Sequence, residues 1–289
     1  MTYALHLLVL LEIYLVVAAS LNLLIGYAGL LQIAHAAYFG VGAYAAALLT
    51  MKLGVGFVPA VAGAALMAGA MSLLVSLPAW RFRGDAFVIM SLSVQVALFA
   101  IFYNWVELTG GPFGLSGIPK PAVYGIDLAT HGSMCAAYGV MVVLCVGVLG
   151  LLQRSPFGRF LQAVRDDELA ARSLGIPARR LKVEAFAVAS ALAGVAGAMY
   201  AAYATYIDPT SFSLDESILI LSMVIVGGTG NVRGPLVGAL TLIAIPELLR
   251  LAALPDALAA NLRLLAYGLL LVVLMRLRPQ GIAGRYRYE

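Results

Sequence analysis

Apolar runs long enough to cross a lipid bilayer follow one another along almost the entire chain. A helical crossing needs about 20 mostly apolar residues, because the bilayer offers no water to satisfy backbone polar groups. In this sequence 63% of the residues are apolar and 11% are charged, whereas roughly a quarter of the residues in a soluble domain are charged. We therefore expect an all-α transmembrane helical bundle surrounded by membrane lipid, and not a soluble domain or a nucleic-acid-binding protein.

The apolar runs predict about nine spans, within a range of eight to ten. They lie near residues 5–25, 30–49, 58–77, 87–105, 134–152, 183–206, 218–226, 236–249 and 262–275. We expect residues 1–289 to form a single transmembrane domain. Its two cysteines, Cys135 and Cys145, fall ten residues apart in one predicted span. A helix separates them by about 15 Å, which is too far for a disulfide bond.

A polar segment, residues 154–182, interrupts the apolar pattern and carries seven of the 18 lysines and arginines. If this segment is cytoplasmic, the nine-span count places fourteen of the 18 basic residues on the same side of the membrane. Basic residues concentrate in the cytoplasmic loops of membrane proteins. The predicted orientation therefore has the N-terminus outside the cell and the C-terminus in the cytoplasm.

The polar segment has the pattern of a short amphipathic helix or helix pair. Its apolar face holds Phe160, Leu161, Val164, Leu169 and Leu174, and its charged face holds Arg159, Arg165, Asp166, Asp167, Glu168 and Arg172. Ala170, Ala171 and Gly175 are small and permit the close approach of a partner. Such a segment either seats in a groove on a partner protein or only connects two spans, and the pattern leaves both interpretations open.

Five polar side chains fall inside predicted spans: Glu12, Asn22, Gln32, His35 and Gln95. Polar groups at membrane depth face the interior of a bundle or a water-filled cavity, so all five are candidates to line a translocation pathway. For Glu12 and His35, a structural hydrogen bond is the alternative to a role in transport. No second histidine or cysteine stands at metal-ligand spacing from His35, so we expect no metal site.

Two glycine-rich stretches contain incomplete enzyme motifs. The sequence GLSG at 114–117 matches the G-x-S-G of rhomboid-type intramembrane proteases, but Ser116 lies in a predicted external loop, without a histidine base on a neighbouring span. The sequence GGTGNVRG at 227–234 lacks the Gly-Lys-Ser/Thr of a phosphate-binding loop. We therefore expect a transport subunit with no catalytic residues, which does not hydrolyse ATP through such a loop.

The two inner-face glycine pairs of the predicted topology have the same spacing. Gly227-x-x-Gly230 repeats the spacing of Gly26-x-x-Gly29, about two hundred residues earlier. Both pairs lie where one predicted span ends and the next begins. This indicates a weak parallel internal repeat, an arrangement on which many transporters are built.

Four stretches together carry a resemblance to a known family: GYAGLLQIAHAAYFGVGAY, LTGGPFGLSGIP, SPFGRFLQAVRDDELAARSLGI with KVEAFAVASALAGVAGAMYA, and SILILSMVIVGGTGNVRGPLVGA. In this order they resemble the permease subunits of ABC importers for branched-chain and other hydrophobic amino acids, the LivM-like half of the LivH/LivM pair. Ala170, Ala171 and Gly175 match the small-small-x-x-x-Gly core of the cytoplasmic loop that such permeases present to their ATPases. The residue before this core is usually Glu in the family and is Leu169 here.

The resemblance implies the partners of such an importer in the bacterial inner membrane. These are a LivH-like second permease, two cytoplasmic ATPase subunits that hold ATP and magnesium, and an external substrate-binding protein, while this chain holds no cofactor. The implied coupling loop spans residues 154–182. Urea, short amides or other small carboxylates are alternative solutes, and an ion-coupled secondary transporter is the alternative from a different class.

Two sets of candidate residues follow from the resemblance and the predicted topology. The ATPase-coupling candidates are Gly158, Arg159, Arg165, Asp166, Asp167, Glu168, Ala170, Ala171 and Gly175. The candidates for docking the binding protein lie in two predicted outer loops and are Gly110, Gly111, Gly114, Gly117, Asp208, Asp215 and Glu216.

Overall fold

The computed structural model describes residues 2–77, 84–123, 126–127, 130–251, 265, 268–269, 272–273, 276 and 280–284. Seven helices in this part of the chain are long and apolar enough to cross a membrane. The protein is therefore a polytopic helical membrane protein, as predicted. The predicted span at 236–249 lies within a further helix, and the span at 262–275 lies largely outside the described residues.

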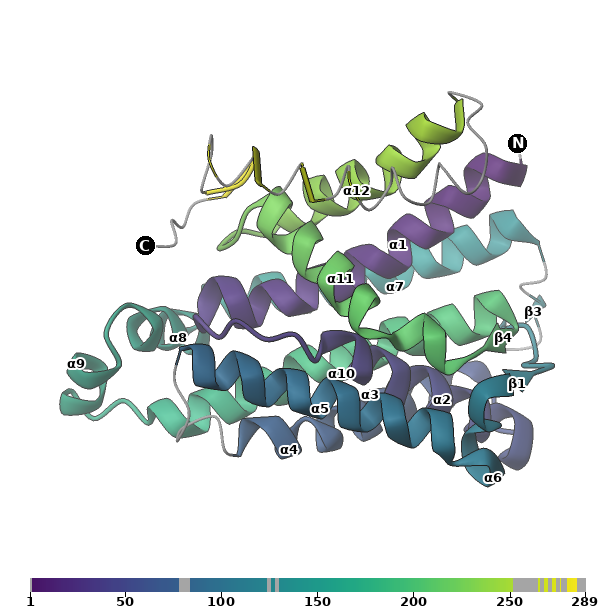
Figure 1. Ribbon diagram of the computed structural model, residues 1–289, viewed down its shortest axis with the longest axis horizontal. Coiled ribbons are helices and arrows are strands. Elements are labelled where there is room, and N and C mark those ends of the chain that lie inside the picture. The colour runs from purple at the N-terminus through teal and green to yellow at the C-terminus, as the bar shows by residue number, and fades with distance from the viewer. Residues whose placement is uncertain are drawn as a thin grey trace.

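The secondary structure is almost entirely helical (Figure 1). The long helices are α1 (Thr2–Asn22), α2 (His35–Leu53), α3 (Phe57–Met71), α5 (Asp85–Asn104), α7 (His131–Arg154), α10 (Ala178–Ala204), α11 (Leu214–Gly227) and α12 (Arg233–Leu251). Shorter helices are α4 (Leu73–Ser76), α6 (Val106–Thr109), α8 (Pro156–Asp166) and α9 (Glu168–Ser173), with a π-helical turn η1 (Leu23–Tyr27) and 3-10 turns η3 (Gly111–Phe113) and η4 (Pro209–Phe212). The strands are β1 (Leu115–Ser116), β2 (Ala122–Val123), β3 (Ile126–Asp127) and β4 (Tyr206–Ile207).

Three helices form the centre of the bundle. In α1, α2 and α10 more than 60% of the spanning residues are buried, whereas in α3, α5 and α7 the share is 33% or less. Helix α10 packs against both α2 and α3, and α1 packs against α7, α10, α11 and α12. The peripheral helices thus present most of their apolar side chains outward, which suits contact with lipid.

Glycines allow the central helices to touch at the backbone. A Cβ atom on Gly42 of α2 would lie 2.3 Å from the Cα of Gly194 of α10, and a Cβ atom on Gly194 would lie 2.6 Å from the carbonyl oxygen of Ala64 of α3. Small residues at helix contacts permit such close packing in membranes. The small residues along residues 185–204 therefore form a packing face.

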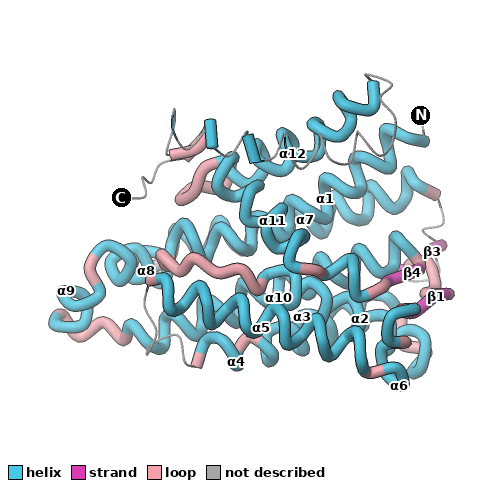
Figure 2. The backbone as a smooth tube through the Cα atoms, viewed as in Figure 1, coloured by secondary structure: helices cyan, strands magenta, loops and turns pink. Residues whose placement is uncertain are grey.

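The second predicted span is helical only in part. It was expected from residue 30, but α2 begins at His35, and residues 29–34 form a non-helical stretch between η1 and α2 (Figure 2). Gly29 has a φ of +67°, a conformation that ends a helix and favours glycine. The residues at 30–34 are mostly apolar without being helical, which explains the error in this boundary.

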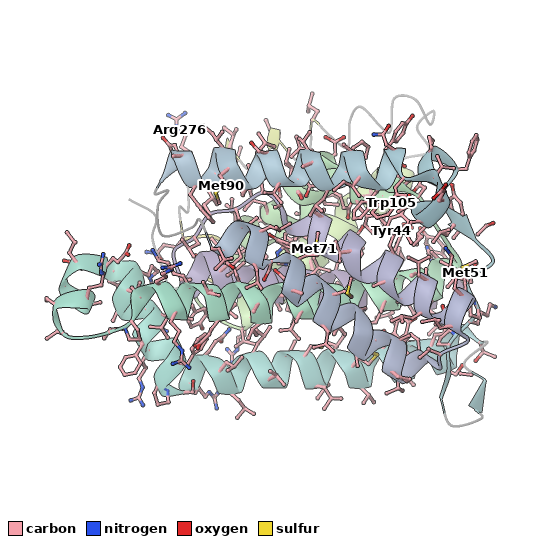
Figure 3. All side chains as sticks on the ribbon, turned by 90° about the horizontal axis from the view of Figure 1, so that it is seen from below. Tyr44, Met51, Met71, Met90, Trp105 and Arg276 are labelled. Carbon is pink, nitrogen blue, oxygen red and sulfur yellow. The ribbon has the colours of Figure 1, made fainter. Side chains whose placement is uncertain are left out.

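The helical bundle has two distinct ends. Helices α8 and α9 lie together at one end, and the short strands lie at the opposite end, near the first residues of α1 (Figure 1). Arg276 lies toward the α8–α9 end, whereas Met51 and Trp105 lie toward the strand end (Figure 3). Arg81 and Arg83 lie outside the described residues. Both cysteines are free, as predicted.

Candidate functional site

The polar segment folds as two helices at one end of the bundle. Ser155 separates α7 from α8. Pro156 occupies the first turn of α8, a position where a missing N–H is tolerated. Asp167 then ends α8 and caps α9, because its Oδ1 accepts hydrogen bonds from the backbone N–H of Leu169 at 2.9 Å and of Ala170 at 3.0 Å. This break divides the segment into α8 and α9.

The break changes which apolar residues of the segment are buried. Leu161 and Val164 of α8 pack into the protein core, as the pattern predicted. Phe160, Leu169 and Leu174 are exposed, and the exposed fraction is 68% for Leu169 and 82% for Leu174. The five predicted apolar residues therefore do not share one buried face: the helical period restarts at Asp167 for Leu169 and Leu174, and Phe160 faces outward within α8. Arg159 and Arg172, near these outward apolar side chains, are also exposed.

Several charged candidates in this segment turn toward the bundle. Arg165 is 11% exposed, pairs with Asp166 at 2.8 Å and donates to the carbonyl oxygen of Gly26. Glu168 forms an ion pair with Lys182 at 2.9 Å. These contacts hold α8 against η1 and α9 against the start of α10. They fix the position of the segment on its own chain.

The small residues of the coupling motif have different surroundings. Ala171 is buried, whereas Ala170 and Gly175 are exposed. Gly158 packs so closely on α7 that a Cβ atom there would lie 2.4 Å from the carbonyl oxygen of Gln153. Gly175 has open space around it and a φ of +82°. The structure therefore favours glycine at this position because of the backbone conformation, and not because space is short.

The conformation of Gly175 gives a prediction. Gly175→Ala should lower the free energy of unfolding by about 1 kcal/mol, because a left-handed conformation is unfavourable for residues with a Cβ atom, and should shift Tm down by about 2–4 °C. Gly175→Asn should shift it less, because asparagine tolerates this region. Thermal unfolding of the two purified variants checks the ranking. A larger loss for asparagine would indicate that size, and not φ, is the constraint.

Beside the helix pair lies an open groove of about 800 Å³. It is lined by side chains of α9, the α9–α10 connection and the first turns of α10, among them Glu168, Arg172, Ile176, Arg179 and Glu184. The charges of both signs and the neighbouring exposed leucines suit contact with a protein surface better than contact with lipid tails.

Three of the predicted pathway residues form hydrogen bonds around the start of α2 inside the bundle. Gln95 of α5 accepts a hydrogen bond from the N–H of Ala37 at 3.0 Å through Oε1 and donates to the carbonyl oxygen of Phe212 at 2.9 Å through Nε2. His35 lies 3.0 Å from Nε2 of Gln32 and 2.8 Å from Oγ of Ser20 through its two ring nitrogens. All are fully or almost fully buried.

Two serines accept hydrogen bonds from further backbone N–H groups at the start of α2 and just before it. The N–H of Ile33 donates to Ser91 and that of Ala36 donates to Ser217, each at 3.0 Å. The first N–H groups of any helix have no partners within the helix. Here side chains of α5 and α11 accept their hydrogen bonds. Gln32, His35 and Gln95 thus have contacts that stabilise the fold, whatever they also do in transport.

The remaining two pathway candidates lie on α1. Glu12 faces α7, where its Oε1 accepts a hydrogen bond from Sγ of Cys135 at 3.5 Å. Asn22 lies at the α8–α9 end, where its side chain bonds to the backbone of Gly230 and Asn231. The five candidates therefore occupy three separate places and do not form one cluster.

The two predicted outer docking loops meet at the opposite end of the bundle. Strands β1 and β4 pair antiparallel, with Leu115 opposite Ile207, and the N–H of Ile118 donates to the carbonyl oxygen of Thr205 at 3.1 Å. The glycine candidates all have positive φ: Gly110, Gly111, Gly114 and Gly117. The outer loops thus form one surface, on which Phe113 is 84% exposed.

The acidic candidates of this end differ in environment. Asp208 caps η4 and accepts hydrogen bonds from the hydroxyls of Thr210 and Ser211. Burial alone would raise its pKa, but these hydrogen bonds outweigh that effect and hold the pKa of Asp208 below its ordinary value. Asp215 is exposed, whereas Glu216 is largely withdrawn into the bundle.

Residues 3–275 match the family described as the branched-chain amino acid transport system permease component. The chain belongs to this family. It is 34% identical to the high-affinity branched-chain amino acid transport system permease protein LivM of Escherichia coli over 293 residues, which cover 93% of this chain and 67% of the relative. It is 25% identical to the LivH permease protein of the same organism, over 96% of this chain and 92% of that relative.

A third relative is named for a different solute. The autoinducer 2 import system permease protein LsrC of Klebsiella pneumoniae is 32% identical over 157 residues, which cover 53% of this chain and 43% of the relative. No solved structure matches the chain. Membership of the family makes this chain a permease subunit of an ABC importer, which is a transport subunit and not an enzyme.

Some residues that organise these sites were not singled out by sequence reasoning. They are Ser20, Ser91 and Ser217 around the start of α2, and Tyr27 and Gln153 near α8. A single serine or tyrosine in an apolar run is a weak signal, because its partner lies on another helix. Only the packing of the helices reveals the pairs.

Proposed function

We propose that this chain carries branched-chain or other hydrophobic amino acids across the bacterial inner membrane as one half of an ATP-driven translocation pathway. The carrying observation is its 34% identity to a LivM permease over 93% of its length. The helix pair α8–α9, which stands outside the apolar bundle with exposed leucines, supports the presence of an ATPase partner. A self-sufficient carrier needs no such element.

The proposed orientation has nine spans, with the α8–α9 end in the cytoplasm. The N-terminus then lies outside the cell and the C-terminus inside. The basic segment 154–182 supports this assignment, because basic residues favour the cytoplasmic side. The strand end, with β1 and β4, then faces the external substrate-binding protein.

The proposed importer contains four further subunits or partners. A LivH-like permease forms the other half of the pathway, two ATPase subunits hold ATP and magnesium, and a binding protein delivers the solute. This chain contributes the coupling loop and holds no cofactor. Relatives of both the LivM and LivH kinds support a permease pair.

Co-expression with the neighbouring genes of its operon tests this function. We expect the tagged chain to co-elute with a second permease and with ATPase subunits, and the ATPase activity to rise only with binding protein that is loaded with leucine, isoleucine or valine. Stimulation by urea, an amide or another carboxylate would change the proposed solute. A chain that elutes alone and moves solute under an ion gradient in liposomes would overturn the proposal in favour of a secondary transporter.

The paired outer loops give a prediction about delivery of the solute. A Cβ atom on Gly114 would lie 2.0 Å from the carbonyl oxygen of Ile207, so Gly114→Ala should separate β1 from β4. We expect half-maximal ATPase stimulation to need at least about tenfold more binding protein, equivalent to about 1.4 kcal/mol. Titration of the reconstituted complex with loaded binding protein measures this shift.

Gly117→Ala is the matched control for this prediction. Gly117 also has a positive φ, of +81°, but nothing lies within 4 Å of a Cβ atom there. This control variant carries the backbone strain without the clash. Equal effects of the two substitutions would mean that strain, and not the pairing of β1 with β4, limits delivery.

A further inference from the structure

Three stretches that are distant in the sequence meet at the α8–α9 end. They are the π-helical turn η1 with the last residue of α1, the end of α7 with helix α8, and the turn 228–232 between α11 and α12. Hydrogen bonds from the side chains of Asn22, Tyr27, Gln153 and Arg165 join them. We call these four residues the inner-end network.

The first link of the network joins α8 to η1. Arg165 donates through Nη1 to the carbonyl oxygen of Gly26. Its aliphatic part lies against Gly29, where a Cβ atom would be 2.6 Å from Cγ of Arg165. Because Arg165 bonds to Gly26 within η1 and packs against Gly29 just after it, a displacement of α8 would displace η1 as well.

The second link joins η1 to the turn between α11 and α12. Asn22 accepts a hydrogen bond from the N–H of Gly230 at 3.2 Å and donates to the carbonyl oxygen of Asn231 at 2.8 Å. The hydroxyl of Tyr27 lies 3.1 Å from the carbonyl oxygen of Gly230 and 2.9 Å from Oε1 of Gln153. A Cβ atom on Gly26 would lie only 2.5 Å from the nitrogen of Gly230.

These contacts bring together the two glycine pairs of the suspected internal repeat. Gly26 lies directly against Gly230, and the latter has a φ of +83°. The side chain of Asn231 continues the network, because its Oδ1 accepts a hydrogen bond from the N–H of Gly234 at 2.6 Å, in the first turn of α12. The route from α8 thus ends on helix α12.

The local backbone suits a position that changes during a transport cycle. π-Helical turns are rare and frequently occur at functional sites. In the turn, Gly228 and Gly230 both have positive φ, and glycine adopts alternative conformations at low energy. The flexible backbone of this turn does not by itself fix where the turn lies. Its position therefore depends on the side chains of other elements that form hydrogen bonds to it.

We propose that Asn22 and Tyr27 are positioning residues through which a displacement of α8 moves the turn 228–232 and, with it, α11 and α12. The inference rests on the proposed function, in which an ATPase displaces α8, and adds the route by which that displacement reaches the spans. Arg165 supplies the input, and the backbone of Gly230 and Asn231 receives the output.

Tyr27→Phe in the complete importer tests this route, because it removes one hydroxyl and leaves the ring. The probe is labelled leucine, and the readout is leucine transported per ATP hydrolysed in liposomes. We expect this ratio to fall about fivefold, which corresponds to one lost hydrogen bond of about 1 kcal/mol, with unchanged assembly of the complex. Tyr138→Phe is the matched control, since it removes a buried hydroxyl that donates to the carbonyl oxygen of Met199 at 2.8 Å, outside the network.

A double substitution tests whether Tyr27 passes the displacement of α8 to the turn 228–232 or only stabilises the fold. If α8 acts through η1, Tyr27→Phe combined with Arg165→Met should lower the ratio little more than Arg165→Met alone, because coupled positions are not additive. Asn22→Leu, which removes both side-chain bonds to the turn, should lower it at least as far as Tyr27→Phe. Additive effects, or an unchanged ratio in Tyr27→Phe and Asn22→Leu, would overturn the inference.

The outcomes also distinguish this inference from the proposed function. A wild-type complex that transports leucine and hydrolyses ATP, with variants that keep its ratio, contradicts only the route. A wild-type chain that assembles with no ATPase contradicts the proposed function and, with it, the route. An equal fall in the ratio for Tyr138→Phe would show that any buried hydroxyl has this effect, which also overturns the inference.

Discussion

Gly42→Ala should prevent the central helices from packing, although it adds a single methyl group. The new Cβ atom would lie 2.3 Å from both the Cα and the carbonyl oxygen of Gly194 on α10. Neither atom is the end of a flexible side chain, so the two helices must separate. Overpacking of a well-packed interior is unfavourable by about 3 kcal/mol or more when the backbone must shift, and we expect Tm to fall by about 10 °C.

Gly150→Ala provides the matched control for this prediction. Gly150 also lies inside a spanning helix, α7, but nothing lies within 4 Å of a Cβ atom there. Alanine has the higher helix propensity, so this variant should be as stable as the wild-type protein or more stable. Thermal unfolding in detergent and the fraction that elutes as a monodisperse peak compare the two. Equal stability of the variants would contradict the contact between α2 and α10.

The close packing of α10 could be anticipated from the sequence, whereas its partners could not. The density of alanine and glycine in residues 185–204 predicts a face that permits close approach. Pattern alone does not say that Gly194 meets Gly42, because many pairs of small residues are compatible with that face. The choice depends on the three-dimensional packing of all the helices together.

The positions of the seven described spans follow from the hydropathy of the sequence. The non-helical break before α2 does not. Hydropathy reports whether a residue prefers an apolar environment, and the apolar residues of the stretch 30–34 meet that criterion without being helical. Its backbone groups and those at the start of α2 are satisfied by Ser91, Gln95 and Ser217. These partners lie about 60 and 180 residues away, so no local pattern announces them.

The polar segment 154–182 shows the same limit on prediction from sequence. Its position, charge and amphipathic character follow from the sequence, and Leu161 and Val164 are buried as expected. The orientation of the charged residues does not follow, because Arg165 and Glu168 each pair with the chain itself. Asp167 separates α8 from α9, and a single helical period carried across it assigns Leu169 and Leu174 to the wrong side.

The exposure of these leucines gives the second large prediction. Leu169→Asp combined with Leu174→Asp should leave the permease folded, because both side chains are mostly in solvent, at 68% and 82%. If α9 seats in a groove on the ATPase, two carboxylates there would lose apolar contact and require desolvation. Central apolar contacts at interfaces contribute about 2 kcal/mol or more, so we expect the ATPase to bind at least about thirtyfold more weakly.

Leu53→Asp is the control, since Leu53 is 70% exposed at the last residue of α2, at the strand end of the bundle. It changes the same chemistry at a place that the ATPase does not reach in the proposed orientation. The affinity of purified ATPase for the permease pair in nanodiscs is measured for the wild type, the double variant and Leu53→Asp. Wild-type affinity in the double variant would contradict docking through α9, whereas loss of affinity in Leu53→Asp would place the ATPase at the opposite end and reverse the proposed orientation of the chain. Because α8 and the inner-end network both lie at the α8–α9 end, that reversal would also remove the network from the side on which ATP is hydrolysed.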